Sequence, residues 1–254
     1  MKLGLVTYNL ARTWDIPTII QRCGAAGFEA VELRTTHAHG VEPTLTRAER
    51  EAVRHQFAGS TVRLLSLGTT CEYHALDRAE VRRNVEETKE FVRLAADVGA
   101  VGVKVRPNRL QVEAGVPVEA TLGQIGLSLR ECGEFAEDHG VGIWLEAHGK
   151  GTSNLAYVRR IMETADHAGV GVCWNSNDSD VVDGSVREGF GLVKEWIRSV
   201  HLRELYLESY PWRELFTLLR GMGYRGYCLA EIPESPEPER LMRYYRALWK
   251  ELTR

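Results

Sequence analysis

The stretch "AEDHGVGIWLEAHG" (residues 136–149) shows the unit from which the fold is built, because it joins the tail of a helix, a glycine and a short apolar run. Glycine is favoured just after a helix, where the backbone takes a left-handed conformation. The apolar run that follows is typical of a strand buried on both faces. The same order recurs along the chain at residues 23–34, 57–70, 96–107, 165–178 and 219–233. The sequence therefore repeats a helix–strand unit.

Two further strands complete the set, at residues 2–9 ("KLGLVTYN") and 196–205 ("WIRSVHLREL"). The segments between the strands have the length and pattern of helices, as at 78–99 and 119–140. Eight such units in 254 residues match the size of a closed parallel barrel, which is typically about 250 residues. We therefore expect an α/β fold, a single (β/α)8 TIM barrel that forms one domain over residues 1–254.

An open, doubly wound sheet is the alternative to a barrel. Its dinucleotide-binding form carries a G-x-G-x-x-G motif between the first strand and the helix after it. Here that place holds "TYNLARTWD" (residues 7–15). No Pro/Gly/Ser-rich linker or low-complexity tract divides the chain, so the pattern favours one barrel domain.

The composition of the chain restricts the partners and the cellular location that we expect for the protein. A net charge of −3 does not predict a surface for nucleic acids or anionic membranes. The five cysteines are odd in number and contain no C-x-x-C pair, which argues against a disulfide framework and a structural zinc site. The N-terminus lacks the apolar core of a signal peptide, and no apolar run approaches the roughly 18 residues of a membrane helix. We expect a cytoplasmic protein with no nucleic-acid or membrane partner.

Polar residues gather near the C-terminal ends of the predicted strands, where the active site of a TIM barrel lies. Alternate residues of a strand point to the same face, and the parity that collects polar side chains is taken as the inward one. These inward residues are Glu32, Arg34, Glu72, Lys104, Arg106, Glu146, His148, Asn175, His201, Arg203 and Glu231. The opposite parity, such as Leu65 and Leu67, is apolar and suits the side that faces the helices.

The negative charges of the inward carboxylates must be balanced by positive charge or by protons. Glu146 and Glu231, with Glu32 nearby, would repel one another or take up protons unless a cation lay between them. Two carboxylates, one imidazole and a side-chain oxygen from the sixth strand form a nitrogen and oxygen set suited to one divalent ion, Mn²⁺, Mg²⁺, Co²⁺ or Zn²⁺. We expect the polar end of "CWNSND" (residues 173–178) to supply the oxygen of the sixth strand.

The order of these groups resembles the xylose isomerase-like TIM-barrel superfamily of sugar isomerases and epimerases. The resemblance is carried by "WLEAHG" on strand five, "WNSND" on strand six, "VHLRE" on strand seven and "YRGYCLAEIP" on strand eight. It implies that Glu146, His201 and Glu231 bind one divalent metal, with Asn175 where most members have aspartate. It also implies that Asp178 contacts substrate, at a place where many epimerase-type members have histidine.

The resemblance and the residue types together predict proton transfer next to a carbonyl. A metal would stabilise a developing enediolate as a Lewis acid, while Glu146 and Glu231 act as catalytic acid and base on opposite faces of a carbohydrate-like small molecule. Lys104, Arg106 and Arg203 would hold an anionic group or polarise substrate oxygens. His148 would orient a ligand glutamate, and Glu32 completes the predicted set around the substrate.

Three alternatives stay open at this point. A lyase or dehydratase would expel a leaving group from the same enediolate. A degenerate barrel would bind a sugar or a partner without turnover, because Asn175 weakens the metal set. A metal-dependent endonuclease of the endonuclease IV kind would need about three metals and a basic rim, which the charge of −3 disfavours. The sequence is also compatible with a homo-oligomer.

Overall fold

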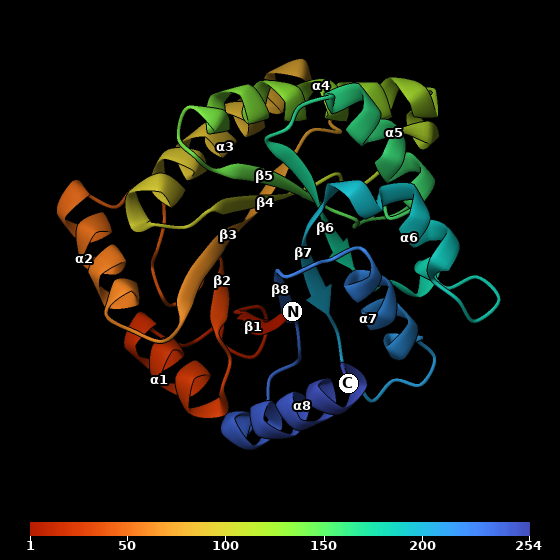
Figure 1. Cartoon of the computed structure of the whole chain (residues 1–254). Coiled ribbons are helices and arrows are strands. Elements are labelled where there is room, and N and C mark those ends of the chain that lie inside the picture. The colour runs from red at the N-terminus through yellow and green to blue at the C-terminus, as the bar shows by residue number, and fades with distance from the viewer.

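Each helix–strand repeat of the sequence forms one unit of a closed barrel in the computed structural model, which describes residues 1–254 (Figure 1). The strands are parallel and follow one another around the barrel in chain order, with β1 closing onto β8. The helices form a ring outside the strands. The expected α/β fold, a (β/α)8 TIM barrel, is confirmed.

The strands are β1 (Lys2–Val6), β2 (Ala30–Arg34), β3 (Arg63–Glu72), β4 (Gly102–Arg106), β5 (Gly142–Glu146), β6 (Val170–Asn175), β7 (Ile197–Leu202) and β8 (Tyr227–Ala230). The α-helices are α1 (Ile16–Ala26), α2 (Arg47–Ala58), α3 (Arg78–Val98), α4 (Val118–Glu137), α5 (Leu155–Ala165), α6 (Arg187–Val193), α7 (Trp212–Gly221) and α8 (Pro238–Leu252). Three short 3₁₀ helices are η1 (Val112–Ala114), η2 (Asp178–Asp180) and η3 (Lys194–Trp196).

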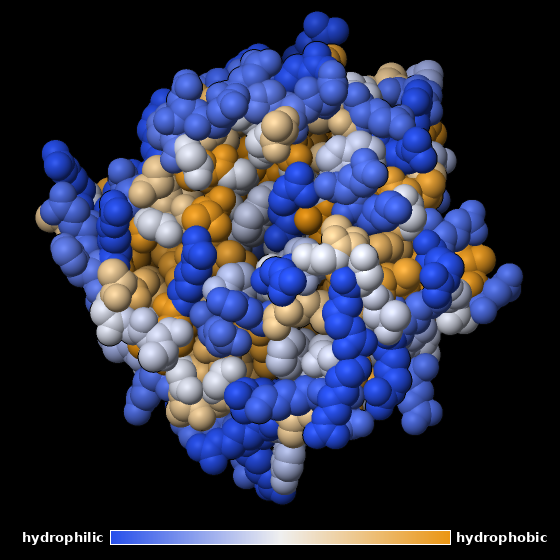
Figure 2. Space-filling model, in the orientation of Figure 1, coloured by the Kyte–Doolittle hydropathy of each residue, from blue (hydrophilic) through white to orange (hydrophobic).

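Apolar side chains form two separate cores. The larger core fills the space between the strands and the helices, and the smaller one lies inside the barrel and consists of Val6, Ala30, Leu65, Trp144, Cys173 and Leu229. Figure 2 shows hydrophilic residues over much of the outer rim and hydrophobic residues between this rim and the centre. Burial of both strand faces explains why the strands read as continuous apolar runs.

Glycine makes room for the largest side chain of the inner core. A Cβ atom on Gly102 would lie 2.5 Å from the ring of Trp144, and one on Gly142 would lie 2.7 Å from the ring nitrogen. Any larger residue at these positions of β4 and β5 would therefore collide with the indole. Large and small residues on neighbouring strands complement one another, as close packing requires.

The structure corrects two details of the sequence-based picture. Leu65 belongs to the inner core, although its parity predicted the outer face, because the register between β2 and β3 shifts between Val31 and Glu32. A bulge of this kind inserts one residue and reverses the facing of the side chains around it. Several strands also end earlier than expected, so that His148, Arg203 and Glu231 follow β5, β7 and β8 rather than lie within them.

None of the helices is both long enough and apolar enough to cross a lipid bilayer. All five cysteines are unpaired and buried.

Candidate active site

A cavity of about 470 Å³ opens where the strands end, at the mouth that the fold predicts for an active site. Seven of the ten residues selected from the sequence line it: Lys104, Arg106, Glu146, His148, Asn175, His201 and Glu231. Glu32, Asp178 and Arg203 are not part of its lining. Alternation along the strands thus identified seven of the fifteen residues that line this cavity.

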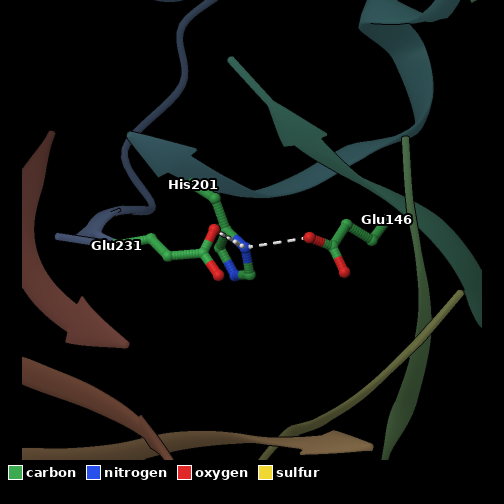
Figure 3. Close-up of side chains that lie close together, drawn as sticks. All are labelled: Glu146, His201 and Glu231. Carbon is green, nitrogen blue, oxygen red and sulfur yellow. Dashed lines mark ion pairs between the residues drawn. The ribbon is translucent and has the colours of Figure 1, made fainter. Parts of the chain in front are cut away.

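Glu146, His201 and Glu231 converge at this cavity (Figure 3). His201 Nδ1 lies 3.6 Å from Glu146 Oε1 and 3.7 Å from Glu231 Oε2, and one ligand atom from each residue lies within 4.8 Å of the others. In Figure 3 the two carboxyl groups approach the imidazole from different sides. The three residues come from β5, β7 and the loop after β8, so the closed barrel is what brings them together.

Glu32 lies beneath these residues and faces His201. Its side chain is fully buried, and Oε1 lies 3.3 Å from His201 Nε2. Ser66 Oγ donates a hydrogen bond of 2.8 Å to the other oxygen, Glu32 Oε2. Gly68 leaves space for the carboxylate, since a Cβ there would lie 2.8 Å from Glu32 Oε1. A carboxylate behind an imidazole orients the ring and leaves the opposite nitrogen to face the cavity.

Lys104 forms the closest contact of this group. Its Nζ donates a hydrogen bond of 2.7 Å to Glu146 Oε2, and both side chains are at most 5% exposed. Burial alone would raise the pKa of Glu146, but the Lys104 ammonium and His201 outweigh burial and hold it well below the usual range. Burial raises the pKa of Glu231, and the attraction of His201 offsets only part of this effect. The pKa values of the two glutamates are therefore shifted in opposite directions.

The donor set fits a divalent cation. Nδ1 of the buried His201, the ring nitrogen that faces away from Glu32, lacks a hydrogen-bond partner, and buried polar atoms of this kind are rare unless a ligand or ion completes them. Two carboxylates and one imidazole at these separations are ligands that divalent ions such as Zn²⁺ and Mn²⁺ accept. Glu146, His201 and Glu231 would hold the ion, and Glu146 Oε1 is the oxygen that Lys104 leaves free.

The end of β6 ties the neighbouring strands together. Asn175 Nδ2 donates to Glu146 Oε1 over 3.4 Å, and Asn177 Nδ2 donates to the Ala147 carbonyl over 2.7 Å. Ser176 Oγ accepts from the backbone N–H of Arg203 over 3.1 Å. The polar end of "CWNSND" therefore binds the loops after β5 and β7, and Asn175 places its amide beside the candidate metal ligands.

Asp178 and Arg203 form an ion pair with each other outside the cavity. The Asp178 side chain is 80% exposed, and the guanidinium of Arg203 lies over the ring of Tyr210. The sequence placed both residues at the substrate. In the structure Asp178 opens the η2 segment, which turns it away from the cavity.

The sequence model described as "Xylose isomerase-like TIM barrel" matches residues 20–252 of the chain. The protein belongs to this family. The match confirms the resemblance drawn from the strand-end residues. A search of curated proteins finds no match.

Solved structures share the xylose isomerase-like fold over almost the whole chain. One is the apo form of a 3-keto-D-glucoside 4-epimerase from E. coli, with 17% identity, 99% of each chain covered and a TM-score of 0.82. The IOLI protein with a zinc atom has 18% identity, a TM-score of 0.78 and coverage of 100% of this chain and 96% of that chain. The probable 3-DHS dehydratase AsbF from Bacillus anthracis has 14% identity, a TM-score of 0.74 and coverage of 98% and 99%.

Other residues of this xylose isomerase-like barrel line the cavity although the sequence predicted no role for them. They are Tyr8, Asn9, Arg34, Asn177 and Glu204, with three apolar residues, Val6, Ile232 and Pro233. Arg34 has the inward parity on β2, so the rule that found Lys104 also indicated it. The other polar residues lie in loops, where alternation gives no direction.

Arg106 and Glu72 form a further ion pair beside the cavity, at the end of β4. Arg106 Nη2 donates to Glu72 Oε1 over 2.5 Å, and Asn108 Nδ2 donates to Glu72 Oε2 over 2.8 Å. His148 lines the same wall, with its buried Nδ1 unpartnered, and burial lowers its pKa. The positive charge of Arg106 is thus already neutralised by a protein carboxylate.

Proposed function

We propose that the protein is a divalent-metal-dependent isomerase or epimerase that moves a proton next to the carbonyl of a carbohydrate-like substrate through an enediolate. The observation that carries this proposal is the convergence of Glu146, His201 and Glu231, whose ligand atoms lie within 4.8 Å of one another. This set lies at the mouth of the barrel, in a cavity that is large enough for a small molecule.

The residues of the site would have separate roles in the reaction. A bound divalent cation would supply Lewis-acid stabilisation of the negative charge that develops on the substrate oxygens. Glu231, whose pKa burial raises, is the stronger base and would take the α-proton at a carboxylate oxygen. Glu146 would deliver a different proton, taken up from solvent in the cavity, to the other face, because Figure 3 shows the two carboxyl groups approaching from different directions. The proton held by Glu231 would pass to solvent, which restores both groups.

Two further side chains would position this pair. Glu32 holds the imidazole of His201 from below, at 3.3 Å from Nε2, so that Nδ1 faces the glutamates. Lys104 fixes one oxygen of Glu146 and prevents the carboxylate from rotating. Preorganised groups of this kind do not need to reorganise during the reaction.

The comparisons support this class of reaction. A 3-keto-D-glucoside 4-epimerase has the same fold along its whole length, and the IOLI structure holds a zinc atom. A second candidate is a dehydratase, since the probable 3-DHS dehydratase AsbF also shares the fold. The two candidates differ only in the fate of the enediolate, which takes up a proton in one reaction and loses a hydroxyl group in the other.

The test is a screen of ketoses, keto-inositols and hydroxypyruvate in D₂O, with Mn²⁺, Mg²⁺, Co²⁺ or Zn²⁺ added. Proton NMR would detect deuterium at the α-carbon, and loss of water would identify a dehydratase. In Glu146→Gln and Glu231→Gln, exchange should fall by about 10²- to 10⁴-fold, the usual contribution of a positioned acid or base. Glu188→Gln, which changes an exposed glutamate on α6, is the matched control. Normal exchange in both site variants would refute the mechanism.

A further inference from the structure

One cation of the candidate active site has no carboxylate partner. Three cationic side chains line the cavity: Lys104 is paired with Glu146 at 2.7 Å and Arg106 with Glu72 at 2.5 Å. Arg34 forms no ion pair with any carboxylate of the chain within 4.0 Å. Its only side-chain hydrogen bond runs from Nη1 to the Thr35 carbonyl, over 3.2 Å.

The position of Arg34 is fixed by its backbone. The N–H of Arg34 donates to Thr7 Oγ1 over 2.9 Å, and His39 Nε2 donates to the Arg34 carbonyl over 2.8 Å. The residue ends β2, two positions after the fully buried Glu32. The guanidinium is therefore presented to the cavity from a rigid strand end rather than from a mobile loop.

The half-buried guanidinium of Arg34 is free to bind a ligand at the cavity. Burial and the neighbouring Arg106 lower the pKa of Arg34, yet arginine keeps its charge in proteins. Four of its five N–H donors have no protein acceptor. Glu204 also lines the cavity but forms no ion pair with Arg34, and it borders a separate apolar cavity together with Ile232 and Pro233. An anion from outside would satisfy both the charge and the donors.

We infer that Arg34 binds the carboxylate of the substrate, and that the substrate is a keto-sugar acid rather than a neutral ketose. The planar guanidinium forms two parallel hydrogen bonds with a carboxylate. A single unpaired cation matches a monoanion, whereas a phosphate dianion would require a second free positive charge. This inference rests on the proposed function only for the keto-sugar part of the ligand.

The test compares ligands that differ at one carbon. D-fructose, D-fructuronate and D-fructose 6-phosphate carry a hydroxymethyl, a carboxylate and a phosphate group at the same position, and D-tagatose with D-tagaturonate forms a second pair. Calorimetry in the presence of Mn²⁺ should show about tenfold to hundredfold tighter binding of a uronate than of its parent ketose, as expected for a charge-assisted bidentate contact. D-fructose 6-phosphate should bind less tightly than D-fructuronate.

Arg34→Gln should abolish the preference for the uronate while changing the affinity of the neutral ketose by less than about threefold. Arg34→Lys keeps the charge without the planar fork and should retain part of the preference. Arg63→Gln is the control. It removes an exposed arginine at the start of β3, at the opposite end of the barrel from the cavity, and should leave both affinities unchanged.

The outcomes separate this inference from the proposed function. Equal or weaker binding of both uronates, or tighter binding of the phosphate, would overturn the inference even if ketose exchange were observed. A preference for the uronate that depends on Arg34, without any α-proton exchange, would support the anion site and count against the isomerase or epimerase.

Discussion

Two layers of side chains inside the barrel differ although they lie on the same strands or directly after them. Ala30, Trp144 and Leu229 belong to the apolar inner core, and the residues two positions further along are Glu32, Glu146 and Glu231. Since alternate residues of a strand share a face, both layers point to the barrel interior. The interior of the barrel therefore changes from apolar to charged over two residues of each strand.

The two layers satisfy different physical requirements. The lower layer excludes water by filling space, with the Trp144 ring against the strands at Gly102 and Gly142. The upper layer contains buried charges, and these are tolerated because a cation faces them, as Lys104 faces Glu146. Stability in this barrel therefore depends on filled volume in the lower layer and on charge compensation in the upper layer.

The largest expected effect on stability comes from emptying the lower layer. Trp144→Ala would leave a cavity between Gly102 and Gly142 that the glycines cannot fill, and it should lower the free energy of unfolding by about 3–5 kcal/mol. Urea denaturation would measure this loss, and Trp144→Phe should cost clearly less. A loss below about 1 kcal/mol for Trp144→Ala would show that the inner layer is not close-packed.

Asp180 is a buried carboxylate that, unlike Glu146, has no ion-pair partner. Asp180 is 4% exposed, and it accepts hydrogen bonds from the Asn177 N–H over 2.9 Å and from the Tyr210 hydroxyl over 3.4 Å. Arg203, whose charge acts on Asp180, is paired with Asp178 instead. Burial raises the pKa of Asp180 to about 7.

Stability should therefore fall as the pH rises through the window from about 4 to 7. In this window the folded protein keeps a proton that the unfolded chain has lost, and the stabilisation that is lost amounts to at most roughly 4 kcal/mol. Asp180→Asn should match the native protein near pH 4 and be more stable near pH 8. Asp183→Asn, at an exposed position of the same loop, should follow the native protein at every pH. Parallel curves for the native protein and Asp180→Asn would contradict this assignment.

The smallest expected effect concerns the neutral amide beside the metal set. Asn175 Nδ2 lies 3.4 Å from Glu146 Oε1, so Asn175→Asp would add a negative charge next to the ligands. It should tighten Mn²⁺ binding by about tenfold and lower the melting temperature of the metal-free protein through carboxylate repulsion.

Asp178→Asn is the companion variant. Its side chain is largely exposed and paired with Arg203 outside the cavity, so Mn²⁺ affinity should change by less than about twofold, and turnover should stay close to that of the native protein. Calorimetry with Mn²⁺ measures both variants. If Asp178→Asn removed the metal and Asn175→Asp had no effect, the loop aspartate would be the fourth ligand.

Much of this molecule could be predicted from local features of the chain. Helix ends with glycine and runs of apolar residues identified all eight strands, because backbone conformation and burial on both faces leave a local signal. Alternation then indicated Lys104, Glu146 and His201, since side-chain direction repeats every two residues along a strand.

Only the tertiary structure decided how these residues are paired. Lys104 contacts Glu146 from a position 42 residues away, Glu32 supports His201 from below, and Arg34 is left without a partner. Such pairings depend on the stagger between strands around the closed barrel, and one bulge turned Leu65 inward. The alternation of a strand is a local property of the chain, whereas the register between two strands is set by their packing against each other.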